Sequence, residues 1–158
     1  MNQLFAFPNP VNEVSARLVA AGVVVLGVMT IAFDQPWLLL VLAYGFVARV
    51  ATGPTLSPLG QLVTRVLTPR LPFAPKYVAG PPKRFAQGIG ATLSLGAVVA
   101  YYGFGSTGAA YALVALIIIA ATLESVFALC IGCRIFAALI RLGVIPEEIC
   151  ERCNNLWA

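Results

Sequence analysis

AAYALVALIIIAATLESVFAL, residues 109–129, is an apolar segment that carries a single charge, Glu124. About 20 consecutive apolar residues are needed for a helix to cross the hydrocarbon core of a bilayer. The segment therefore predicts a membrane-spanning helix. The whole composition agrees, because 60% of the 158 residues are hydrophobic and 10% are charged, whereas soluble domains carry about 25% charged residues.

Three further apolar segments precede it, at residues 18–33, 36–50 and 85–104. The first two are shorter than a usual spanning helix and are joined by a tight turn at Asp34, so we expect a short helical hairpin, fully spanning or re-entrant. The third carries small residues at every fourth position, a spacing that favours close helix packing. These residues are Gly88, Thr92, Gly96 and Ala100. We predict an all-α membrane protein of one domain, residues 1–158, with four transmembrane helices.

The central loop, residues 51–84, contains seven of the eleven prolines, so it cannot span a membrane. Ser57 followed by Pro58 is typical of a helix N-cap and the first helical position. Apolar residues then recur at helical spacing opposite polar ones, which predicts an amphipathic helix lying at the membrane interface. The rest of the loop is basic and irregular.

The distribution of the ten lysines and arginines predicts the orientation. None lies in the turn at Asp34 or in the second short loop, residues 105–108. Cytoplasmic loops carry an excess of Lys and Arg, so we expect both termini and the central loop in the cytoplasm of a bacterial plasma membrane.

The four cysteines form two CxxC pairs separated by sixteen residues, within a cytoplasmic tail at residues 130–158. This spacing is typical of a tetrathiolate metal site built from Cys130, Cys133, Cys150 and Cys153. A closed shell of four thiolates suits structural zinc, and iron or an iron–sulfur cluster is the alternative. The chain contains no histidine, which excludes histidine-ligated haem or chlorophyll.

The two pairs can meet only if the chain bends after the last span. A straight helix over residues 109–142 would be about 51 Å long, against a hydrocarbon core of ~30 Å. We expect the bend at Gly132 and a C-terminal interfacial hairpin, with its first helix ending at Gly143. A redox role for the Cys130–Cys133 pair is the alternative. If the last spanning helix ends at Cys130 and Cys133, the pair lies at a helix C-terminus, where the helix dipole disfavours a thiolate. This position counts against the redox role.

Glu124 is the acid that lies within an apolar span, where charged residues are usually paired or functional. Arg49 and Arg17 are expected near the same face of the membrane. We therefore predict a structural ion pair between Glu124 and Arg49 or Arg17. Glu13 and Arg17 are four residues apart, which predicts a second pair along the first helix.

Several short motifs resemble a family of small bacterial integral membrane proteins catalogued as domain of unknown function 4395. They are NPVNEVSARLVAAG, SPLGQLVTRVLTP, PPKRFAQGIGA and LESVFALCIGC, and the most specific elements are PKRFA and CxGC. The matching positions are Pro10, Asn12, Glu13, Arg17, Ser57, Pro58, Pro82, Lys83, Arg84, Phe85, Ala86, Glu124, Cys130, Gly132 and Cys133. The resemblance implies no assigned activity and links some relatives with thioredoxin-like or sulfurtransferase proteins.

Two functions follow from these patterns. The first is a non-enzymatic accessory or scaffold subunit of a membrane complex, with a metal-clamped cytoplasmic tail that contacts other membrane subunits. The second is a membrane thiol–disulfide oxidoreductase or sulfur-relay protein that works with a thioredoxin-like or sulfurtransferase partner. The lipid bilayer is a partner in both, and no nucleic-acid partner is expected.

Overall fold

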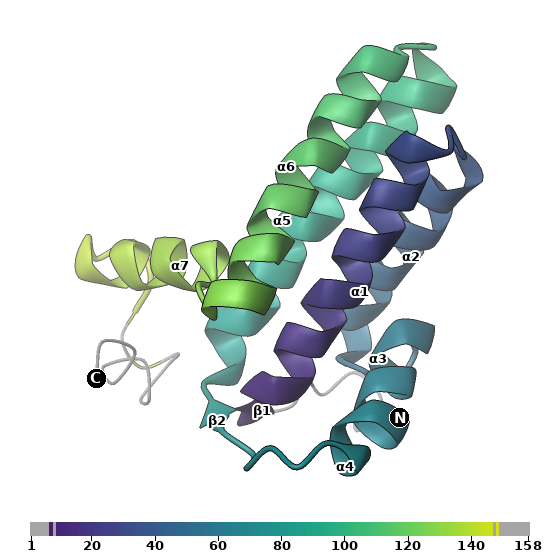
Figure 1. Cartoon of the computed structure of the whole chain (residues 1–158). Coiled ribbons are helices and arrows are strands. Elements are labelled where there is room, and N and C mark those ends of the chain that lie inside the picture. The colour runs from purple at the N-terminus through teal and green to yellow at the C-terminus, as the bar shows by residue number, and fades with distance from the viewer. Residues whose placement is uncertain (1–6, 8, 147, 149–158) are drawn as a thin grey trace.

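The computed structural model describes residue 7, residues 9–146 and residue 148. Four helices run along one axis and form the body of the molecule (Figure 1). They are α1 (Glu13–Ala32), α2 (Trp37–Thr52), α5 (Gly80–Val98), continued by the π-helical η2 (Val99–Gly103), and α6 (Thr107–Phe127). The prediction of a mostly helical fold is confirmed.

Within the described residues, α1, α5 with η2, and α6 are long and apolar enough to cross a membrane. The second predicted span is α2, which has 16 residues and is shorter. Large apolar side chains on the outside of the bundle are exposed, as expected for surfaces that contact lipid. Examples are Val25, Leu40, Leu95, Leu116 and Ile119.

Two small cores hold the bundle together. One joins Val23 of α1, Phe46 of α2 and Ile117 of α6, and the other is built around Leu39, Ala97 and Val114. Between α2 and α5 the approach is closest at Gly90, where an added Cβ would lie 2.2 Å from a ring carbon of Phe46.

The prediction of close packing along the small-residue stripe is confirmed in part. A Cβ at Gly96 would lie 3.3 Å from a methyl carbon of Leu113 on α6, and Ala100 packs against the second core. The first half of the stripe makes no close contact, because a Cβ at Gly88 would meet nothing within 4 Å and Thr92 is exposed. The close contact with α2 depends on Gly90, which lies outside the predicted stripe.

The central loop contains the predicted helix. Ser57 caps it by accepting a hydrogen bond from the Gly60 N–H, and Pro58 occupies the first helical position. The helix runs through α3 (Pro58–Leu62), the π-helical η1 (Val63–Leu67) and α4 (Thr68–Arg70). It packs on α1, since Leu59 contacts the α1 side of the first core and the Thr68 and Ser15 hydroxyls are hydrogen-bonded at 2.8 Å.

A short antiparallel pairing closes this end of the bundle. Strands β1 (Val11–Asn12) and β2 (Tyr77–Val78) pair with Val11 opposite Val78. The sequence patterns did not predict strands here. The ion pair between Glu13 and Lys76, at 3.3 Å, supports the same junction, so the predicted Glu13–Arg17 pair is replaced by a contact between two segments.

Candidate functional site

The chain turns away from the bundle axis between α6 and the last described helix, α7 (Ile131–Arg141), which leaves the bundle on the left of Figure 1. The predicted bend at Gly132 was wrong. Helix α6 ends at Phe127, Ala128 adopts a left-handed conformation with φ 54°, and the Leu129 N–H bonds the Leu123 carbonyl. The predicted end of the following helix is confirmed, because Gly143 follows it with φ 75°.

The earlier bend changes the setting of the cysteines. Cys130 is the N-cap of α7, and Cys133 lies three residues inside the helix. The Cys133 N–H donates a hydrogen bond to the Cys130 sulfur at 3.3 Å. The expectation that this pair sits at a helix C-terminus was therefore wrong, and so was the electrostatic argument against redox chemistry that rested on it.

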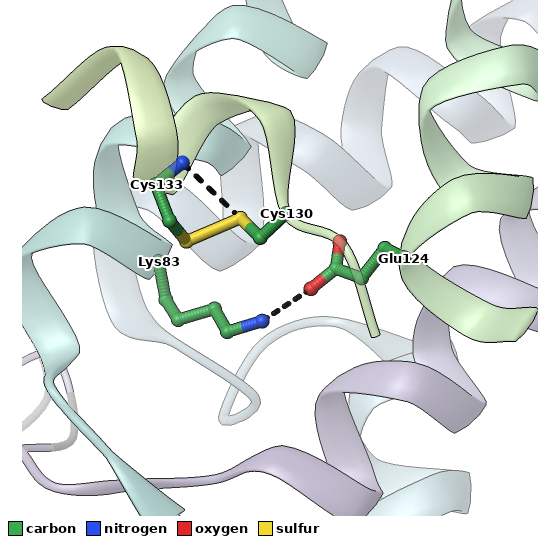
Figure 2. Close-up of a disulfide and its surroundings, with 4 residues drawn as sticks. All are labelled: Lys83, Glu124, Cys130 and Cys133. Carbon is green, nitrogen blue, oxygen red and sulfur yellow. Dashed lines mark hydrogen bonds and ion pairs between the residues drawn. A yellow bond between two sulfur atoms is a disulfide. The ribbon is translucent and has the colours of Figure 1, made fainter. Parts of the chain in front are cut away.

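Cys130 and Cys133 are joined by a disulfide, with their Cα atoms 5.2 Å apart (Figure 2). Both residues are buried, with 9% and 8% of their surface exposed. A CxxC pair with its first sulfur at a helix N-terminus is the arrangement in which a thiolate is best stabilised, because the positive end of the helix dipole and a backbone N–H both face it.

Gly132 allows this helix start to lie directly on α5. A Cβ built on Gly132 would come within 2.5 Å of both the Cα and the Cβ of Ala86. Further along α7, Phe136 packs against Phe85 with ring centroids 5.5 Å apart. The CxGC motif on α7 and the PKRFA motif on α5 thus pack directly against each other.

A buried ion pair lies beside the disulfide (Figure 2). The Lys83 ammonium nitrogen is 2.5 Å from an oxygen of Glu124, and their side chains are 8% and 14% exposed. The prediction that Glu124 pairs with Arg49 or Arg17 is therefore corrected. Lys83 lies near the start of α5, which packs against α6, and its long side chain reaches inward to the acid.

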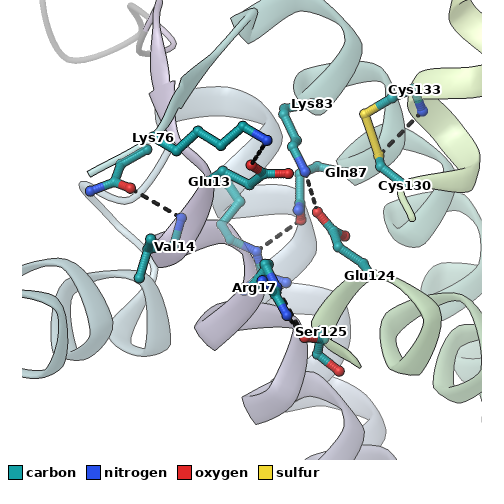
Figure 3. Close-up of polar contacts among 12 residues, drawn as sticks. Glu13, Val14, Arg17, Lys76, Lys83, Gln87, Glu124, Ser125, Cys130 and Cys133 are labelled. Carbon is teal, nitrogen blue, oxygen red and sulfur yellow. Dashed lines mark hydrogen bonds and ion pairs between the residues drawn. A yellow bond between two sulfur atoms is a disulfide. The ribbon is translucent and has the colours of Figure 1, made fainter. Parts of the chain in front are cut away.

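The two arginines make other contacts. Arg17 donates hydrogen bonds to the carbonyls of Ser125 and Val126 at the end of α6 (Figure 3). Cationic groups at a helix C-terminus interact favourably with its dipole and its free carbonyls. Arg49 donates to Gln87 at 2.9 Å and to Ser57 at 3.2 Å.

Cys130 and Glu124 line the same cavity, which has a volume of about 110 Å³ and extends between the helices. The remaining wall is mostly apolar, apart from Gln87, and includes Phe46 and Ile135. The structure thus brings together a disulfide, a carboxylate with its ammonium partner, and a small cavity lined in part by Cys130.

The second predicted pair, Cys150 and Cys153, lies outside the described residues. Within the described part of the chain, no three Cys, Asp or Glu side chains are grouped closely enough to hold a metal ion. The tetrathiolate site for zinc, iron or an iron–sulfur cluster stays a prediction. The disulfide and the metal site exclude each other at any moment, because both require the sulfurs of Cys130 and Cys133.

Lys83 and Gln87 are the site residues that the sequence interpretation missed. Lys83 was counted among the basic residues that set the orientation, and Gln87 one turn later carried no distinguishing signal. Residues four apart share a helix face, so the sequence places Lys83 and Gln87 on one side of the helix, but it does not show that this side is buried.

Comparison with known proteins gives one match. A family model described as "Domain of unknown function (DUF4395)" matches residues 11–141, which include α1 to α7 and the Cys130–Cys133 pair. Neither the curated proteins nor the solved structures contain a match. Since the matched region covers most of the chain, and includes the motifs that carried the resemblance except for the first two residues of NPVNEVSARLVAAG, the protein belongs to the DUF4395 family.

Proposed function

We propose that this protein is a membrane thiol–disulfide exchange protein whose redox centre is the Cys130–Cys133 pair. The observation that carries the proposal is the position of the pair at the start of α7, with Cys130 as N-cap and its sulfur accepting the Cys133 N–H. In the reduced state the same N–H and the helix dipole favour a thiolate on Cys130, and the thiolate is the form that attacks disulfides.

The orientation that we propose places this centre at the cytoplasmic face. In Figure 1 the start of α1, the end of α2, the start of α5 and the end of α6 lie together at one end of the bundle. The described lysines and arginines belong to this end, whereas the turn at Asp34 and the loop before α6 have none. Because α2 returns antiparallel to α1, we infer four crossings, with α2 spanning about 24 Å at 1.5 Å per residue.

A disulfide at the cytoplasmic face suits a redox role. Cytosolic thiols are kept reduced, so disulfides on that side of the membrane are usually catalytic or redox-sensing. The Lys83–Glu124 pair beside the disulfide supports the proposal as well, because charged groups are buried in a membrane protein mainly where they serve a function.

The exchange uses the two cysteines in order. The Cys130 thiolate attacks one sulfur of a disulfide in a thioredoxin-like partner and expels the partner's other sulfur as a thiolate. Cys133 then attacks the Cys130 sulfur and gives its proton to the expelled thiolate, while the remaining partner sulfur leaves as a thiolate. Two electrons pass to the partner, whose disulfide becomes a dithiol, and the Cys130–Cys133 bond closes. The reverse sequence oxidises the partner.

Single-cysteine variants test this assignment. In a protein in which Cys150 and Cys153 are replaced by serine, we compare Cys133→Ser, which keeps Cys130, with Cys130→Ser, which keeps Cys133. After reduction, each is mixed with an aromatic disulfide at pH 7 and the released thiolate is followed by absorbance. We expect Cys130 to react about tenfold faster than an ordinary exposed thiol of pKa ~8.5. We also expect Cys133 to react more slowly than Cys130.

A second measurement tests reversibility. The variant with both Cys130 and Cys133 should equilibrate with glutathione as one two-electron couple, measured by thiol alkylation and mass. If neither cysteine exchanges in the folded protein, or if Cys133 is the faster of the two, the proposed role of the helix N-terminus is wrong.

The four-crossing topology has its own expected result. Single cysteines introduced as Asp34→Cys or Ser106→Cys should be labelled from outside intact cells by a membrane-impermeant maleimide, because both turns lie at the end without basic residues. A cysteine introduced as Arg65→Cys, on the exposed side of η1, should be labelled only after the membrane is opened. Labelling of Arg65→Cys in intact cells would reverse the orientation.

A further inference from the structure

Arg49 is a buried arginine whose described contacts are all neutral. It is 5% exposed, donates to Gln87 and Ser57, and lies over the Phe46 ring with its guanidinium carbon 4.7 Å from the ring centroid. Among the described residues no carboxylate lies within ion-pair distance of Arg49, and Glu124 attracts it only from further away. A buried charge without a counter-ion in contact is unfavourable, so the site favours an anion.

The neighbouring charges do not supply one. Lys83 is also buried, at 7% exposed, and Glu124 is already in contact with it at 2.5 Å. Glu13 is paired with Lys76. The buried group of Arg49, Lys83 and Glu124 therefore contains two positive charges and one negative charge, and one positive charge remains uncompensated.

Arg49 and Lys83 both line a cavity of about 350 Å³ at the basic end of the bundle. This cavity lies between α1, the helix of the central loop and α5, and it is distinct from the smaller one at Cys130. Hydroxyl and amide side chains complete its polar wall. These belong to Asn12, Ser15, Thr64, Thr68 and Gln87.

We propose that this cavity binds a phosphate-class oxyanion, supplied either as a free ion or as the phosphate of a lipid headgroup. The guanidinium carries more N–H donors than its two described bonds use, and its planar fork suits phosphate oxygens. The anion neutralises the charge that Glu124 leaves uncompensated. The Thr64 hydroxyl already donates to the Gly60 carbonyl, but one hydroxyl of the hydrogen-bonded Ser15–Thr68 pair keeps a free hydrogen that can be donated to the anion. The proposal does not depend on the redox role of the cysteines.

The test measures thermal unfolding of the full chain in a non-ionic detergent, with sodium phosphate replacing sodium chloride at constant ionic strength. Anything that binds only the folded state raises the unfolding temperature. A second arm uses nanodiscs of phosphatidylcholine with and without phosphatidylglycerol. The variants are Arg49→Gln, which removes the charge, and Ala16→Leu, which fills the cavity wall without removing any polar group. Arg65→Gln is the matched control, because it removes one exposed positive charge at the same end.

We expect an increase of several degrees in the wild type and in Arg65→Gln, and its loss in Arg49→Gln and Ala16→Leu. If the increase occurs with phosphate, the free ion binds; if it occurs only with phosphatidylglycerol, the lipid headgroup supplies the phosphate. Both results support the site. If Arg49→Gln does not fold, the comparison of the wild type with Ala16→Leu tests the proposal on its own. An equal shift in wild type and Ala16→Leu, or no shift in either arm, overturns the proposal.

Discussion

Replacement of Lys83 by methionine is expected to lower the free energy of unfolding by about 3–5 kcal/mol, the range found when one partner of a buried ion pair is removed. The reason is the remaining Glu124 carboxylate, whose side chain is 14% exposed and which would lose its 2.5 Å contact. Methionine is unbranched and only one atom shorter than lysine, so the loss reports mainly the charge rather than a cavity. Reversible denaturation in detergent micelles measures it.

The chain provides its own control in the other described ion pair. Lys76 contacts Glu13 at 3.3 Å, and the Lys76 side chain is 75% exposed. Glu13 is 14% exposed, like Glu124, but it lies in the first turn of α1, where the positive end of the helix dipole stabilises a carboxylate. A pair with one exposed partner contributes about 0–1 kcal/mol, so Lys76→Met should cost much less stability than Lys83→Met. The double variant Lys83→Met with Glu124→Leu should recover much of the loss, since both partners of this ion pair are removed together and neither is left without the other. If Lys83→Met and Lys76→Met behave alike, the Lys83–Glu124 contact is not a buried pair in the membrane protein.

Gly132→Ala is expected to destabilise the folded protein by about 1–3 kcal/mol, as overpacking of a close contact usually does. The new methyl group would lie 2.5 Å from the Cα of Ala86, so backbone rather than a side-chain tip would have to move. Helix α7 would separate from α5 at the point where the disulfide is held. We therefore also expect increased alkylation of Cys130 and Cys133 after reduction, measured by mass.

Gly88→Ala is the matched control on α5. A Cβ there meets nothing within 4 Å, and alanine is favoured over glycine inside a helix by roughly 0.5–1 kcal/mol, so this variant should be as stable as the wild type or more stable. A Gly132→Ala protein with unchanged stability and unchanged alkylation would show that α7 is not fixed on α5 at this contact.

The helices of the bundle could be predicted from the sequence because their signal is local. Long apolar runs, a turn at Asp34 and the Ser57–Pro58 start each depend on neighbouring residues, and the structure has helices or turns at these places. The position of the bend between α6 and α7 could not be predicted in this way, because it depends on the backbone conformation of one residue. Ala128, an ordinary residue in sequence terms, adopts a left-handed conformation, whereas the more conspicuous Gly132 remains helical.

The candidate site was predicted in part. Cys130, Cys133 and Glu124 were identified, because cysteine pairs and a charge in an apolar span are conspicuous. The partner of Glu124 was not, because pairing depends on the rotation of α5 relative to α6, and Lys83 looked like one basic residue among several. A correct choice required knowing that Lys83 and Gln87 face inward on α5, and that information is tertiary.

The turn between α6 and α7 has a consequence for how a partner would reach the proposed redox centre. Residues 128–130 alone separate a helix suited to crossing the bilayer from one that leaves the bundle. In the proposed orientation, this short link holds the Cys130 sulfur at a constant depth, close to the boundary between lipid and cytosol. A soluble partner that adheres even weakly to the headgroups would then search for its target in two dimensions instead of three. Encounter rates would depend on the lipid composition around the protein as much as on the contact surface of the two proteins.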